Sequence, residues 1–169
     1  PKSRRVLTNI EFCVDISGSM MAQFGTGTRY DASMKSINDF LDYREGDAFG
    51  LTFFGNNVMH WVPLTTDASA FRCAPPFMKP DVAPPGFGGT EIGKALLACQ
   101  EVLISRDEGD RMIILVSDGS SSDLMNGNDE LIARKLRRDN IVVNAIHISS
   151  TEVPVGVVNI TAMTGGEIF

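Results

Sequence analysis

The feature that most constrains the fold is an alternation of short apolar runs with amphipathic segments along the chain. Four apolar runs suit buried strands: 10–15, 48–54, 112–116 and 141–148. Between and after them, apolar side chains recur at helical spacing over 30–43, 91–105, 128–138 and 157–163. Such alternation predicts a parallel sheet with helices on both faces, a doubly wound α/β fold.

Three segments depart from this regular pattern. Gly55, Asn56 and Asn57 predict a tight turn, so we expect residues 58–64 to return antiparallel as an edge strand. Residues 65–90 are rich in proline and glycine, and they predict a loop with one short helix near 68–71. Residues 167–169 predict the start of a last strand. At 169 residues, the chain fits one domain with a substantial core.

Charge and hydropathy exclude several classes of partner. The net charge of −6, with Lys and Arg spread along the chain, gives no electrostatic footprint for nucleic acid or anionic lipid. The longest apolar run falls well short of the ~20 residues of a membrane helix, so we expect no direct membrane insertion by this fragment. The chain begins with Pro1 and carries no signal peptide, and we therefore expect an excised piece of a longer protein.

The cysteines and histidines are interpreted as structural. Cys13, Cys73 and Cys99 are too few and too widely spaced for a disulfide framework or a cysteine zinc site, and buried apolar thiols are the expected state. His60 falls on the expected edge strand and His147 on a core strand. We expect both to be hydrogen-bonded structural residues rather than ligands.

Polar side chains follow the first and third apolar runs and precede one of the helices. Asp15, Ser17 and Ser19 follow the first run, Thr90 stands before the helix at 91–105, and Asp118 follows the run at 112–116. In open α/β sheets, ligands bind outside the carboxyl ends of the strands. These two carboxylates and three hydroxyls are hard oxygen donors, which Mg²⁺, Mn²⁺ or Ca²⁺ prefers, and the three segments contain no His or Cys.

The spacing of the first segment has a physical logic. Alternate residues 15, 17 and 19 in an extended turn can face one point, while Gly18 is expected to let the backbone pass close. Two formal negative charges do not neutralise or fill the shell of a cation that takes about six oxygens. We therefore expect an open position for water or for a carboxylate from outside.

These residues resemble the metal-ion-dependent adhesion site (MIDAS) of the von Willebrand factor A family. The matching positions are Asp15, Ser17, Ser19, Thr90 and Asp118. The resemblance spans nearly the whole chain. It implies a cation-dependent protein-binding domain without enzymatic activity, in which a partner's Asp or Glu completes the metal shell. It also implies that Ser17 and Ser19 bind the cation directly, and that Asp15 holds a coordinated water.

The same resemblance implies a Rossmann-like, mostly parallel sheet of six strands in the order 3-2-1-4-5-6, with only the third strand antiparallel. Family members usually end in one more helix, so residues 1–169 are expected to form a single domain that lacks this helix. Many bacterial relatives of this compact kind belong to membrane-tethered proteins, which suggests a tethered parent by analogy.

Four further residues flank the expected site: Met21, Phe24, Arg29 and Phe87. They are candidates for a rim that contacts the partner. The aromatic and methionine side chains could equally pack into the core, and Arg29 could equally pair with Asp31 or with a site carboxylate.

The alternative function is a metal-dependent phosphoryl-transfer enzyme or a phospho-acceptor domain, because several doubly wound folds place an Asp after the first strand beside Mg²⁺. A phosphatase of that kind would need a second Asp where Ser17 stands. A receiver domain would need a Lys near the last strands, and residues 141–148 contain none. The segment 25–28 also lacks the glycine spacing of a nucleotide-binding loop.

Overall fold

A computed structural model describes residues 6–72 and 79–169 of the chain. Its principal sheet contains five strands, which are β1 (Thr8–Asp15), β4 (Ala48–Phe54), β5 (Val58–Thr65), β6 (Asp110–Ser117) and β7 (Ile141–His147). They lie in the order β5-β4-β1-β6-β7. β1 is central and pairs in parallel with both β4 and β6, whereas β5 pairs antiparallel with β4 as expected from the turn at Gly55.

The expected sixth strand is too short to count as one. Beyond β7, Ile168 forms only an isolated parallel bridge with Ala145. Backbone hydrogen bonds from Ala145 to Glu167 (2.9 Å) and from Phe169 to Ala145 (2.8 Å) accompany it. The parallel direction of residues 167–169 and their place beside β7 are those predicted, but three residues are too few to form a full ladder of backbone hydrogen bonds. The sheet therefore has five strands rather than six.

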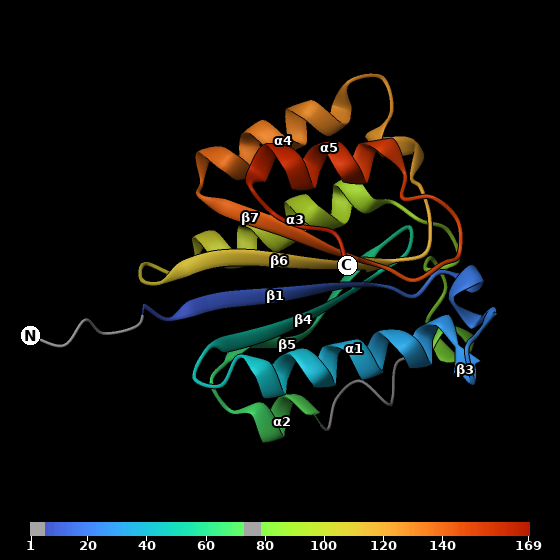
Figure 1. The fold of residues 1–169 in the computed structure, drawn as a ribbon, viewed down its shortest axis with the longest axis horizontal. Coiled ribbons are helices and arrows are strands. Elements are labelled where there is room, and N and C mark those ends of the chain that lie inside the picture. The colour runs from blue at the N-terminus through green and yellow to red at the C-terminus, as the bar shows by residue number, and fades with distance from the viewer. Residues whose placement is uncertain (1–5, 73–78) are drawn as a thin grey trace, which may run out of the picture.

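Helices cover both faces of the sheet (Figure 1). Their bounds are α1 (Arg29–Tyr43), α2 (Ala68–Arg72), α3 (Ile92–Ile104), α4 (Asn128–Arg138) and α5 (Val155–Thr164). α1 and α2 lie on one face, and α3, α4 and α5 lie on the other. Short 3-10 helices are η1 (Gly18–Met21), η3 (Pro80–Val82) and η4 (Ser122–Leu124). No helix among the described residues combines the length and apolarity that a bilayer crossing demands.

Each face of the sheet has its own hydrophobic cluster, because successive side chains of β1 point to opposite faces. Phe12 packs with Phe40 of α1, with ring centroids 5.9 Å apart, on the face that α1 and α2 cover. Its neighbour Cys13 faces the other way and packs among side chains of α3, including Cys99. Both thiols are free and buried, as expected, and Cys73 lies outside the described residues.

A line of polar side chains crosses the sheet within the cluster on the α3 face. Glu11 of β1 is 1 % exposed and accepts a hydrogen bond from Thr52 of β4 (3.2 Å). The same hydroxyl is hydrogen-bonded to Nδ1 of His60 on β5 (2.8 Å). Burial raises the pKa of Glu11 to about 8, against a smaller lowering by the Thr52 hydroxyl. His147, on β7, bonds through Nε2 to the Thr151 carbonyl (2.9 Å), so both histidines have structural partners.

A small hairpin that the sequence did not predict precedes α1. β2 (Gln23–Phe24) and β3 (Gly27–Thr28) pair antiparallel, and Gly25 in their turn has φ +63°. Thr28 then caps α1, because its hydroxyl accepts from the Asp31 amide (3.1 Å) while Asp31 accepts from the Thr28 amide (3.0 Å). This reciprocal cap fixes where α1 begins, and therefore where Arg29 lies.

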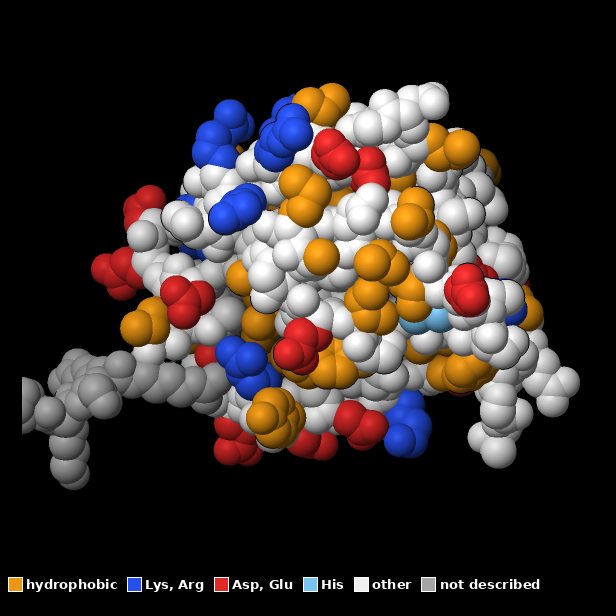
Figure 2. Space-filling view, turned by 45° about the horizontal axis from the view of Figure 1, so that its top comes forward, with side chains coloured by type: hydrophobic (Ala, Val, Ile, Leu, Met, Phe, Trp, Pro, Cys, Tyr) orange, Lys and Arg blue, Asp and Glu red, His pale blue; other side chains and the backbone are white. Residues whose placement is uncertain are grey.

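Basic side chains gather at one end of the face that carries α4 and α5 (Figure 2). The last turn of α4 contains Lys135, Arg137 and Arg138, and its first turn contains Asp129 and Glu130. This polarity complements the helix dipole. The basic end of α4 leads into the amino end of β7. It therefore lies at the amino ends of the parallel strands, whereas the candidate site lies at their carboxyl ends.

Candidate metal centre

Asp15 ends the central strand β1 and lies wholly buried beneath the loop that follows. Its Oδ1 accepts a hydrogen bond from the Ser17 amide (2.8 Å), and its Oδ2 accepts one from the Ser117 hydroxyl (2.8 Å). Burial raises the pKa of Asp15 to about 6; these hydrogen bonds lower it in part, and the charge of Asp118 raises it further. Both carboxylate oxygens are therefore fixed by donors from two different strand ends.

The loop after β1 presents two serine hydroxyls side by side. Ser17 Oγ and Ser19 Oγ lie 3.2 Å apart, and Ser17 is buried. Met20, the next residue, is fully buried within the 3-10 turn η1 and anchors it to the body of the domain. The expected reason for Gly18 is not confirmed, because a Cβ there would meet nothing within 4 Å and its φ is not positive.

The loop that contains Thr90 packs directly against the first loop. The Gly18 amide donates to the Gly88 carbonyl (3.4 Å), and the Glu91 amide donates to the Gly55 carbonyl (3.0 Å). Gly55 has to be glycine, because a Cβ would overlap the backbone of Phe87. The turn after β4 therefore packs against the Thr90 loop and holds it at the carboxyl end of β1.

The N-terminus of α3, immediately after this loop, is capped by side chains from a distant segment. Ser121 accepts from the Ile92 amide (3.0 Å) and donates to the Thr90 carbonyl (3.2 Å). Asp123 accepts from the amides of Gly93 (3.0 Å) and Lys94 (2.9 Å). Sequence reasoning missed these roles and that of Ser117. A cap from thirty residues downstream leaves no local signal.

Asp118, just beyond β6, is paired with Arg29, the first residue of α1. Arg29 Nη1 lies 2.8 Å from Asp118 Oδ2, with side chains 24 % and 6 % exposed respectively. The same nitrogen lies 3.4 Å from the Ser19 carbonyl. Of the two pairings that the sequence left open for Arg29, the structure has the one with a site carboxylate.

The residues expected at the rim differ in their exposure. Met21 is 37 % exposed and Phe24 is half-buried. Phe87 is 7 % exposed and belongs to the core cluster on the α1 face, so it offers little surface to a partner. Of the four residues expected at the rim, Met21, Phe24 and Arg29 therefore have accessible surface.

The donor set fits a hard divalent cation better than a soft one. Two oxygens bound at right angles to one Mg²⁺, each at roughly 2.1 Å, lie about 3 Å apart, which is close to the 3.2 Å between the two serine hydroxyls. Within residues 6–72 and 79–169, no three His, Cys, Asp or Glu side chains cluster as metal ligands. A cation here would depend on two carboxylates together with neutral hydroxyls.

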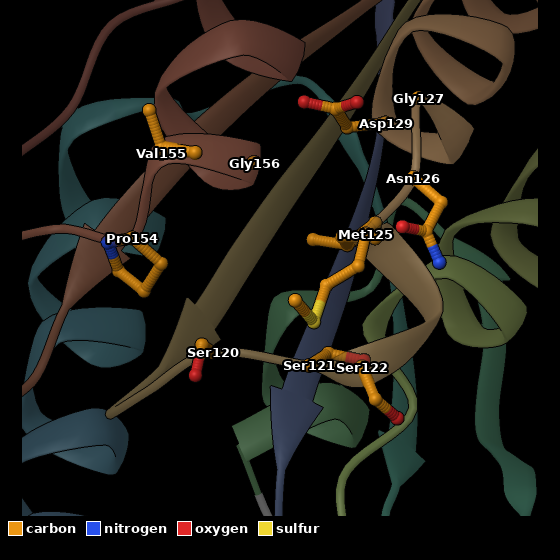
Figure 3. Close-up of a pocket in the computed structure, with 11 residues that line it drawn as sticks. Ser120, Ser121, Ser122, Met125, Asn126, Gly127, Asp129, Pro154, Val155 and Gly156 are labelled. Carbon is orange, nitrogen blue, oxygen red and sulfur yellow. The ribbon is translucent and has the colours of Figure 1, made fainter.

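A pocket of about 580 Å³ opens beside this centre, and its lining begins two residues after Asp118 (Figure 3). Ser120, Ser121 and Ser122 line one end of it, and Pro154 and Val155 at the start of α5 lie across from Met125 and Asn126. Met125 and Val155 on its rim are 64 % and 74 % exposed. The surface next to the centre is thus hollow, with apolar side chains at its edge.

Comparison with known proteins places the chain in a family. The sequence profile of the von Willebrand factor type A domain matches residues 10–120, a range that contains all five candidate ligands. Among curated proteins, no sequence matched the chain.

Solved structures share the fold at low sequence identity. An aerotolerance-related membrane protein from Bacteroides fragilis, with multiple mutations to serines, superposes with a TM-score of 0.81 at 19 % identity, covering 96 % of this chain and 90 % of that one. The conserved hypothetical protein BatB from Bacteroides thetaiotaomicron gives 0.80 at 19 %, with 96 % and 88 % covered. Proximal thread matrix protein 1 from the mussel byssus, with a zinc-occupied MIDAS motif, gives 0.77 at 20 %, with 96 % and 41 % covered.

Proposed function

The chain belongs to the von Willebrand factor type A domain family, and from that premise we propose that it is a protein-binding domain that holds one divalent cation and grips a partner's carboxylate through it. Domains of this family commonly mediate protein–protein interaction and are generally not enzymes. The residues that we propose as the cation site are Asp15, Ser17, Ser19, Thr90 and Asp118. We further propose that residues 1–169 act as a single domain.

The observation that carries this proposal is the convergence of oxygen donors at the carboxyl ends of β1 and β6. Ser17 and Ser19 present adjacent hydroxyls, while Asp15, whose two oxygens already accept hydrogen bonds, is suited to hold a water rather than a direct bond. When bound, the cation supplies an electrophilic centre that accepts one more oxygen ligand. The chain's own part is to fix the ligands and leave one side of the centre open.

Recognition of an acidic partner follows from local charge. Asp15 and Asp118 together carry two negative charges at most, so a bound divalent cation is not over-neutralised and still attracts a carboxylate. The protein as a whole carries −6, but screening over about 8 Å at physiological ionic strength weakens that global repulsion. Met21, Phe24 and Arg29, together with the rim of the adjacent pocket, are the proposed surroundings of the partner's acidic residue.

Titration calorimetry with Mg²⁺, Mn²⁺, Ca²⁺ and Zn²⁺ tests the cation site. We expect weak binding of Mg²⁺ or Mn²⁺, loss of binding in Asp15→Ala, and weaker binding in Ser17→Ala, Thr90→Ala and Asp118→Ala. Thr26→Ala, an exposed hydroxyl on the nearby hairpin turn, is the matched control and should bind normally. Circular dichroism should show all variants folded, since the changed oxygens lie in loops or at a strand end.

No binding of any of the four cations at millimolar concentration would refute the cation site. For the partner, a pull-down in Mg²⁺ is repeated with chelator and with each acidic residue of a captured protein changed to its amide. Binding that survives both treatments would show that another surface is used. Turnover of a generic phosphate ester in Mg²⁺ would instead favour the phosphoryl-transfer alternative.

A further inference from the structure

The position of Arg29 is unusual for a basic residue. It is the first residue of α1, where the helix dipole is positive and disfavours a cation. Its backbone is held in place, because its amide donates to the Ala22 carbonyl (2.9 Å) and its carbonyl accepts from the Ser33 hydroxyl (2.9 Å). The guanidinium therefore extends from a fixed point, and its proximity to Asp118 is built into the fold.

Among the described residues, the guanidinium of Arg29 makes its hydrogen bonds on the side of the candidate centre. Nη1 lies 2.8 Å from Asp118 Oδ2 and 3.4 Å from the Ser19 carbonyl. Nε is buried and has no hydrogen-bond partner among the described residues. A partly buried cation thus lies against one proposed ligand and beside the loop that carries another.

We propose that Arg29 is a built-in counter-ion that stabilises the metal-free centre and opposes entry of the cation, so that it sets the metal affinity of the domain. The inference rests on the proposed function above. With Arg29, the fixed charges of the centre sum to −1 instead of −2 when both carboxylates are ionised. A bound divalent cation then leaves the centre at +1, which one partner carboxylate neutralises.

The consequence is a coupling between the cation and the acidic partner. Because Arg29 repels the cation but attracts the partner carboxylate, it weakens binding of the cation alone more than binding of the cation together with the carboxylate. Each ligand should therefore increase the affinity of the domain for the other, by the same factor. Arg29 would thereby favour metal occupancy when a partner is present. It acts on the centre through charge and needs no direct contact with the partner.

The test compares Mg²⁺ and Mn²⁺ affinities by calorimetry in the 169-residue chain carrying Arg29→Gln, Arg29→Met or Arg29→Lys. Removal of the charge in the first two should tighten binding by at least about tenfold, because like charges a few ångströms apart repel strongly at partial burial. The Arg29→Lys variant retains the charge and should stay near the unmodified protein.

The melting temperature without metal is the second readout, and it should fall in the variants whose metal affinity rises. In chelator, Arg29→Gln and Arg29→Met should lower the melting temperature, since Asp118 loses its partner, and added Mg²⁺ should then raise the melting temperature by more than in the unmodified protein. Arg44→Gln is the matched control, because Arg44 Nε pairs with Asp47 at 2.8 Å with similar burial (22 % and 1 % exposed) at the far end of the sheet. It should destabilise the fold without changing metal affinity.

The outcomes separate the two proposals. Affinity that is equal or weaker in both charge-removing variants overturns the role of Arg29 while leaving the cation site standing. Absence of binding in the unmodified protein and in both variants overturns the cation site and the role of Arg29 together.

Discussion

Ser117 donates a hydrogen bond of 2.8 Å to Asp15 across 102 residues of sequence, and so joins the ends of β6 and β1 beneath the candidate centre. The bond is buried, and the other Asp15 oxygen accepts from the Ser17 amide. Ser117 therefore helps to fix the orientation of the Asp15 carboxylate, although Ser117 itself is not one of the proposed metal ligands.

We expect Ser117→Ala to lower the free energy of unfolding by about 1–3 kcal/mol, because it leaves a buried carboxylate oxygen without its donor. It should also raise the pKa of Asp15, since the hydrogen bond favours the ionised form. Urea unfolding measures the change in stability. Mg²⁺ titration at neutral pH measures whether the less readily ionised Asp15 weakens metal binding. Ser105→Ala, an exposed hydroxyl at the end of α3, should change neither; unaltered metal binding in Ser117→Ala would count against its role.

Glu11 should make the domain less stable as pH rises. Its pKa is about 8 in the folded protein against an ordinary value of 4.5. The native state therefore retains a proton that the unfolded state releases, and the free energy of unfolding falls between these two pH values by at most about 1.4 kcal/mol per pH unit. The stabilisation is complete below pH 4.5 and is lost as pH passes 8.

The variant Glu11→Gln should flatten the pH dependence of the unfolding free energy, because glutamine keeps the shape of the side chain but has no titratable carboxyl group. Urea unfolding from pH 7 to 9 separates the effect of Glu11 from that of Asp15, whose pKa is about 6 and which is therefore mostly ionised throughout this range. Glu101→Gln on the exposed side of α3 is the control and should retain the slope. An unchanged slope in Glu11→Gln would mean that the carboxyl is not held neutral by burial.

Removal of the Asp123 cap should affect stability and metal affinity together. Asp123→Ala leaves the amides of Gly93 and Lys94 without their acceptor, which should cost about 1 kcal/mol of unfolding free energy. Because Thr90 stands just before this helix, Mg²⁺ should also bind more weakly. Asp123→Asn can still accept a hydrogen bond and should recover part of both losses. Full metal affinity in Asp123→Ala would show that Thr90 does not depend on the cap.

The sequence predicted the regular elements well where packing alone determines them. Residues 48–54 and 128–138 form β4 and α4 with the expected bounds, because an apolar run or a strong helical period leaves little freedom. The hairpin of β2 and β3 was missed, since two-residue strands are too short to show any period. The sixth strand was overestimated from three residues.

The candidate centre was predicted as a set of ligands but not as a network. Loop positions after strands pointed to Asp15 and Asp118, but not to the distant residues Ser117 and Arg29 that hydrogen-bond to them. Ser121 and Asp123 act on a helix thirty residues before them, which no local pattern encodes. The partner of Arg29 was left open because carboxylates at Asp31 and at the centre compete for it, and only the fold decides between them.

Gly55→Ala should disrupt the support of the Thr90 loop. The added methyl group overlaps Phe87 main-chain atoms, which cannot move as a flexible side chain would. We expect a loss of about 1–3 kcal/mol in unfolding free energy and weaker Mg²⁺ binding. Gly18→Ala has open space around its Cβ and is the control for stability. Equal stability of the two variants would refute the close approach at Gly55.

The central position of β1 has a consequence for the order of folding events. The first strand of the chain pairs with β6 in a register that joins Val14 to Val116, so the two carboxylates of the centre meet only after a long loop has closed. Pairings of this kind form slowly and late. A cation that needs both carboxylates then finds no site in the early ensemble, and it should leave the refolding rate nearly unchanged while it slows unfolding. A bound cation is therefore expected to stabilise the sheet after it has formed and not to guide its assembly.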